Sequence, residues 1–214
     1  MRHFLAGERQ VKLSGQHPMK YTPDDGRTDN VGQYQQLVDR MVRAARLDRT
    51  LYNEVATDAT ATRQATAVVI MASVASALAP FVTNVAGGGV NGGLGIALIT
   101  TLFGILSWLA WAAVSWWVGT RMINTSAEDV EFWQVARAMG FAHAPGVLAV
   151  AAIVPGVAGI IGFVSLFWLL ATGFMATRAS MRLTDGQAVL TMIAGFIPAF
   201  LFVGIVVYIV DSAI

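Results

Sequence analysis

The sequence predicts an all-α, polytopic membrane protein with five transmembrane helices and an N-terminal amphipathic interfacial helix. Two observations carry this prediction: five apolar stretches, and the placement of Lys and Arg between them. A helix needs about 20 mainly apolar residues to cross a hydrocarbon core of about 30 Å. We expect spans at about 65–83, 94–119, 132–154, 157–177 and 188–210, the third reaching full length only if its helix begins near Phe132.

The 14 basic residues all fall on one side of the path that these spans imply. Most precede the first span, Arg121 and Arg137 lie between the second and third apolar stretches, and Arg178 and Arg182 lie between the fourth and fifth. The loops at 84–93 and 155–156 carry none. Because loops rich in Lys and Arg stay in the cytoplasm, we expect a multi-pass protein of the cell (inner, cytoplasmic) membrane with its N-terminus inside and its C-terminus outside.

The composition agrees with a membrane protein, since 56% of residues are hydrophobic and 13% are charged, whereas soluble domains carry about 25% charged residues. The chain has no cysteine, which excludes thiol catalysis, disulfides and thiolate metal sites. No signal peptide is visible before the first apolar stretch, so we expect the first span to be an uncleaved anchor.

The part of the chain before the membrane divides in two. Residues 1–30 form a polar tail that we expect to be disordered alone or ordered by a partner, and residues 31–63 form a cytoplasmic amphipathic helix and linker ahead of the five-helix membrane domain at 64–214. Apolar residues recur there at helical spacing, opposite Arg40, Arg43 and Arg46. This pattern favours a helix lying in the interface beside anionic lipid, and the alternatives are a helix packed on the bundle or a short coiled-coil contact.

Three features of the membrane domain predict how its helices lie. Trp116 and Trp117 end the second span, where an aromatic belt is expected at the cytoplasmic interface. Pro145, followed by Gly146, should break the third span. The fourth span opens on glycines that share one helical face and predict a close-packing groove for a neighbour, expected to be the third span. These glycines are Gly156, Gly159 and Gly162.

Three segments carry a resemblance to a known family: 47–54 with Asp58, 137–148, and 155–163 with Trp168 and Leu169. On these segments, residues 37–209 resemble the bacterial branch of the Yip family, the Ypt/Rab-interacting integral membrane proteins. The resemblance implies five membrane helices and a non-enzymatic protein. The acidic Asp-Leu-Tyr-Gly-Pro motif of the eukaryotic members is absent, the nearest segment being 51–53, so the resemblance does not imply binding of small GTPases.

His143 is the one ionisable side chain well inside a predicted span, and polar groups there are costly and usually functional. It is either a structural side chain that bonds a backbone carbonyl freed by Pro145, or an axial ligand of a haem or chlorin. The sequence shows no carboxylate pair, phosphate-binding loop, zinc-ligand spacing or nucleophile elbow. We therefore expect no catalytic residues, no metal site, no cofactor and no nucleic-acid partner.

These observations favour a non-enzymatic membrane scaffold or interaction protein of the Yip type, acting through helix packing and the basic interfacial helix. Its expected partners are the lipids of the anionic leaflet and other membrane proteins or a second copy. One alternative is an accessory structural subunit of a larger bioenergetic complex, respiratory or photosynthetic. Another is a channel or small-molecule transporter.

Overall fold

The computed structural model describes residues 27–124, 127 and 129–213, and the secondary structure of this part of the chain consists of helices joined by short turns, with no strand. The polar tail predicted at 1–30 lies almost entirely outside the described residues. The elements in order are α1 (Arg27–Ala45), α2 (Arg49–Thr57), α3 (Ala61–Ala86), α4 (Val90–Val118), a π-helical turn η1 (Gly119–Ile123), α5 (Phe132–Ala142), a 3₁₀ helix η3 (Ala144–Ile153), α6 (Ala158–Ser180) and α7 (Asp185–Ala213).

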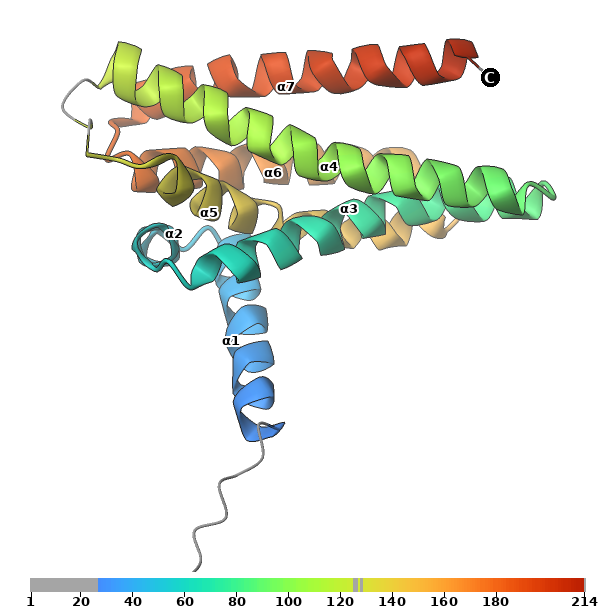
Figure 1. The fold of residues 1–214 in the computed structure, drawn as a ribbon, viewed down its shortest axis with the longest axis horizontal. Helices are drawn as coiled ribbons and strands as arrows, with labels where there is room; N and C mark the ends of the chain where they lie inside the picture. Colours follow the sequence, from blue (N-terminus) through green and yellow to red (C-terminus); the bar gives the residue numbers. More distant parts are fainter. Residues whose placement is uncertain (1–26, 125–126, 128, 214) are drawn as a thin grey trace, which may run out of the picture.

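Four stretches are long and apolar enough to cross a membrane: Ala61–Ala86, Val90–Ile123, Phe132–Ile153 and Ala158–Ser180. A fifth apolar stretch, Asp185–Leu201, begins α7, which continues to Ala213. The predicted all-α membrane fold is therefore confirmed. In Figure 1, α3, α4, α6 and α7 lie lengthwise along one another, whereas α2 and α5 gather at the end of the bundle opposite the C-terminus.

The third span is divided, as its Pro-Gly pair predicted. After Ala142 the N–H of His143 donates to the carbonyl of Gly140 at 3.1 Å, and the chain continues as the 3₁₀ helix η3 with Pro145 in its first turn. Pro145 has no N–H to give, so the carbonyl of Ala142 accepts instead from the Thr172 hydroxyl on α6 at 2.7 Å. This hydrogen bond joins the break in the third span to α6.

The fully buried large side chains gather at the α2–α5 end of the molecule. They include Leu51, Tyr52 and Val55 of α2 and Met139 and Phe141 of α5. Large apolar side chains on α4, α6 and α7 are instead exposed, as helices surrounded by hydrocarbon are expected to be. The molecule thus has a packed end rich in polar contacts and a longer part whose outer surface suits lipid.

Among the residues that the structure describes, none lies against the glycines of the groove expected at the start of α6, which corrects the predicted packing. A Cβ added at Gly159 or Gly162 would meet no heavy atom within 4 Å, and neither would one at Gly156, whose φ of +84° calls for glycine in a turn. Close approaches occur elsewhere: an added Cβ at Gly140 would lie 2.8 Å from the Ala65 Cβ, and one at Gly173 would lie 2.5 Å from Trp111. Spacing on one face identified a groove, but it cannot tell an open groove from a filled one.

Candidate functional site

The chain reverses twice before the first span, and a capping aspartate marks each reversal. After α1, Leu47 has a positive φ of 63°, and Asp48 then caps α2 by accepting from the N–H of Thr50 at 2.9 Å. After α2, Asp58 accepts from the N–H of Thr60 at 2.9 Å, just before α3. These turns bring α2 and the first turns of α3 to the side of α1 that carries Arg40.

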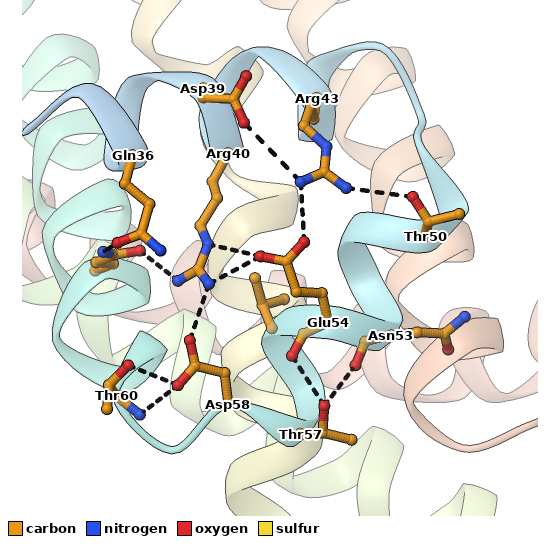
Figure 2. Close-up of polar contacts among 12 residues, drawn as sticks. Gln36, Asp39, Arg40, Arg43, Thr50, Asn53, Glu54, Thr57, Asp58 and Thr60 are labelled. Atoms are coloured by element: carbon orange, nitrogen blue, oxygen red, sulfur yellow. Dashed lines mark hydrogen bonds and ion pairs between the residues drawn. The ribbon is translucent and has the colours of Figure 1, made fainter. Parts of the chain in front are cut away.

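Arg40 is the centre of the resulting polar contacts, which Figure 2 shows. It lies on α1 and is only 4% exposed. Its guanidinium donates from Nη2 to Glu54 at 2.8 Å and to Asp58 at 2.9 Å, and from Nη1 to the Gln64 amide oxygen at 2.7 Å. One side chain therefore joins α1 to α2, to the turn after it and to α3.

Arg43 lies one turn further along α1 and completes the group. Its Nε donates to Asp48 at 2.9 Å and its Nη1 to the second carboxylate oxygen of Glu54, also at 2.9 Å. Glu54 is thus shared by two arginines from one helix (Figure 2). We call Arg40, Arg43, Asp48, Glu54 and Asp58 the arginine cluster.

Each carboxylate of the arginine cluster is held in its charged form. Burial raises the pKa of Glu54, but hydrogen bonds from Arg43 and Arg40 outweigh it and leave the pKa below its ordinary value. Hydrogen bonds from Thr60 and then Arg40 lower the pKa of Asp58, and those from Thr50 and Arg43 lower the pKa of Asp48 to about 2. Hydrogen bonds to Asp48 and Glu54 raise the pKa of Arg43, so Arg43 and the three carboxylates stay ionised at neutral pH.

A third arginine reaches α2 from the other side. Arg137 of α5 is 7% exposed and donates from Nε to the carbonyl of Val55 at 3.1 Å and from Nη2 to that of Ala56 at 2.5 Å. These carbonyls belong to the last turn of α2, where a helix leaves its carbonyl groups unpaired and its dipole favours a cation. Arg137 is therefore a C-terminal cap supplied by a distant part of the sequence.

The predicted interface residues take three different positions. Arg40 is buried in the cluster and Arg43 is ion-paired there, so the expectation that both meet lipid headgroups is wrong. Arg46 is exposed, and its side chain makes no ion pair within the described part of the chain. Trp116 donates from Nε1 to the carbonyl of Val130 at 2.8 Å, and Trp117 is 55% exposed. The sequence analysis considered the arginines alone, although their partners Glu54 and Asp58 lie only 14 and 18 residues after Arg40.

The face of α1 opposite the arginine cluster is open. Val31, Tyr34, Val38 and Val42 recur at spacings of three and four, and they are between 42% and 68% exposed. We call them the α1 stripe. Leu37 and Met41 pack against the core instead. Figure 1 shows α1 standing out from the bundle, across the long axes of α3, α4, α6 and α7.

His143 lies at the break in the third span. Its Nδ1 is 2.8 Å from the carbonyl oxygen of Met139, which is free because the N–H of His143 has turned to Gly140. The geometry supports the structural reading, with Met139 as the acceptor. The carbonyl of Ala142, which Pro145 cannot pair, accepts a hydrogen bond from the Thr172 hydroxyl. The sequence analysis did not identify Thr172. No three His, Asp or Glu side chains gather to hold a metal ion among the described residues.

Comparison with known proteins gives one match. The family model of the Yip1 domain matches residues 52–208, from within α2 to within α7. No curated protein and no solved structure matches the chain. The matched region contains Glu54, Asp58 and Arg137, while α1 with Arg40 and Arg43 precedes it.

Proposed function

The chain belongs to the Yip1 domain family of integral membrane proteins, and on this premise we propose that it is a non-enzymatic scaffold of the cell membrane. The helical bundle anchors the protein, and α1 is a docking arm at the cytoplasmic surface for lipid and for other membrane proteins or a second copy. The observation that carries the proposal is the two-sided character of α1. One face is locked by Arg40, and the opposite face presents the α1 stripe.

The direction of the α1 stripe supports contact with the bilayer. Because α1 crosses the long helices (Figure 1), it runs roughly along the membrane plane when those helices span it. Val38 is about 160° around the helix from Arg40 at 3.6 residues per turn. Arg40 faces α2, which lies at the end of the bundle. The α1 stripe therefore turns away from that end and toward the hydrocarbon, as in an interfacial helix.

The charges available to anionic lipid differ from those expected from the sequence. Arg40 and Arg43 are neutralised by carboxylates, whereas Arg46, Arg49 and Arg63 are exposed and form no ion pair in the part of the chain that the structure describes. We assign headgroup contact to these three, with each basic residue near an anionic surface contributing about 1 kcal/mol.

The absence of native cysteine makes a single-cysteine test free of background. The full-length protein, carrying an environment-sensitive fluorophore at Val38→Cys, is reconstituted into vesicles containing phosphatidylglycerol. We expect blue-shifted emission and quenching by a lipid-soluble nitroxide. Asp39→Cys is the matched control, since the side chain of Asp39 is 66% exposed on the neighbouring face. A fluorophore at this position should show the emission of a water-exposed probe. Emission typical of a water-exposed probe at both positions would contradict the proposal that α1 docks on the membrane.

The accessory-subunit function has one observation in its favour, the uncovered face of α6. Gly159 and Gly162 are open, and Phe163 and Phe167 beside them are 65% and 56% exposed. A transmembrane helix of another protein could approach there closely. Purification from native membranes in mild detergent separates the two functions: stoichiometric additional subunits favour the accessory role, and a lone or self-associated chain favours the scaffold.

A further inference from the structure

A cavity of about 400 Å³ lies among the membrane-spanning helices, distinct from the arginine cluster. Its walls come from the middle of α3 and α4, from η3 and from α6. Small side chains leave this space unfilled: glycines at 104, 146 and 162 and serines at 73, 76, 107 and 165 are part of its lining. The volume falls within the range of about 300–1,000 Å³ that is typical of small-molecule sites.

Two polar groups in the cavity have unused hydrogen-bonding capacity. The Ser107 hydroxyl oxygen is buried without a partner among the described residues, whereas Ser76 nearby satisfies its hydroxyl on the carbonyl of Ala72 at 2.9 Å. His143 donates from Nδ1 to Met139, so in a neutral ring Nε2 is an acceptor, and no described side chain or backbone group bonds it. An unmade hydrogen bond is costly in hydrocarbon.

We propose that this cavity binds the hydroxyl end of an uncharged, single-chain lipid. A hydroxyl can donate to the His143 Nε2 and accept from the Ser107 hydroxyl, which satisfies both groups. An ether or a keto group cannot donate to His143. The described lining contains no Lys or Arg to neutralise a phosphate and no Asp or Glu to pair with an amine, so a charged headgroup would be buried without a counterion.

Gly162 is the lining glycine at which a larger side chain can be introduced into the cavity with the least local contact. It is part of the lining, yet an added Cβ would meet no heavy atom within 4 Å. Gly162→Leu therefore begins a branched side chain at a Cβ that meets no atom, and this side chain takes up part of the ligand space. Gly159→Leu, one turn earlier on the same helix, is equally free of contacts and is not part of the lining, which makes it the matched control. Ser107→Ala removes one of the two polar partners with little change in volume.

The experiment is photo-crosslinking of a diazirine-labelled long-chain fatty alcohol to the purified full-length protein in detergent, with the labelled peptides mapped. We expect labelling of the α3 and α6 segments that line the cavity. Unlabelled alcohol should compete about tenfold better than its methyl ether, because the ether leaves a buried partner unpaired. Gly162→Leu should reduce labelling about tenfold or more at unchanged melting temperature, and Gly159→Leu should retain it. Ser107→Ala should weaken competition by the alcohol and by the ether alike, because the oxygen of either can accept from the Ser107 hydroxyl.

Three results would overturn the proposal. Equal competition by alcohol and ether would mean that any chain fills the space. Competition by phosphatidylglycerol as strong as that by the alcohol would assign the cavity to a phospholipid chain. Equal loss of labelling in Gly159→Leu and Gly162→Leu would place the bound lipid on the outer surface of α6. None of these results bears on the docking of α1, which is tested separately.

Discussion

Arg40→Gln tests whether the arginine cluster holds α1 on the bundle. The substitution removes the charge and the forked donor group that reaches Glu54, Asp58 and Gln64. Hydrogen bonds to charged groups contribute about 1.5–3 kcal/mol each, and breaking a buried ion pair costs about 3–5 kcal/mol. The side chains of Glu54 and Asp58 are 41% and 27% exposed, so water partly replaces the lost partner. We therefore expect α1 to lose about 2–3 kcal/mol of docking free energy, which is roughly a 30- to 150-fold increase in its open population.

Hydrogen–deuterium exchange read by mass spectrometry measures this opening directly, because local unfolding exposes the amides of one element at a time. Exchange should accelerate in α1 and stay unchanged in α4. Arg46→Gln is the matched control, because it removes the same charge directly after the end of α1, from an exposed side chain without an ion pair in the described structure. Surface changes of this kind stay within about 0.5 kcal/mol. Equal exchange of α1 in the two variants would refute the reasoning.

The remaining predictions concern acid, the break in the third span, and topology. The pKa values of Asp48, Glu54 and Asp58 are depressed in the folded protein. The contribution of these carboxylates to the stability of the folded protein is therefore complete above their ordinary pKa values of 3.8 and 4.5. This contribution is lost as pH falls through the folded pKa values toward about 2. The distance between nitroxides at Gln35→Cys and Met122→Cys should stay constant from about pH 7 to pH 5 and broaden below about pH 4; a change confined to the neutral range would contradict this. His143→Leu should destabilise the protein in thermal melts by about 1–3 kcal/mol, since the Met139 carbonyl loses its donor, while His143→Gln should stay close to the original; equal losses in both would assign the effect to ring packing. Tags at Met1 and after Arg182 should be reachable only from the cytoplasm and a tag after Ile214 only from outside; an internal C-terminus would remove the five-span topology.

The fold could be predicted from the sequence because its signals are local. Apolar length gives the spans, and a proline followed by glycine marks the break at Pro145. A capping pair at Thr184 and Gln187 marks the start of α7, where the Gln187 N–H donates to the Thr184 hydroxyl at 3.4 Å and the Gln187 side chain accepts from the Thr184 N–H at 3.0 Å.

The candidate site could be predicted only in part, because its partners are distant in sequence. A helical projection of α1 separates the arginines from the apolar positions, but it cannot show that Glu54 and Asp58 fold back onto Arg40. It also does not distinguish Leu37 and Met41, which are partly buried against the core, from the open α1 stripe. The open space beside Gly159 and Gly162 is likewise set by how α6 is oriented in the bundle, and spacing along one helix does not contain that information.

The cap that Arg137 places on α2 fixes an order of assembly during synthesis. The contacts of Arg40 and Arg43 join residues that leave the ribosome within 24 positions of one another, so α1 and α2 can dock before most of the membrane domain exists. The bonds from Arg137 to Val55 and Ala56 span 82 and 81 positions and must wait for the third span to be made. Until then the last carbonyls of α2 are open to water, and insertion of α5 closes them. Thus α1 and α2 dock early during synthesis, and the C-terminal carbonyls of α2 are paired late, by Arg137 of the span that contains the break.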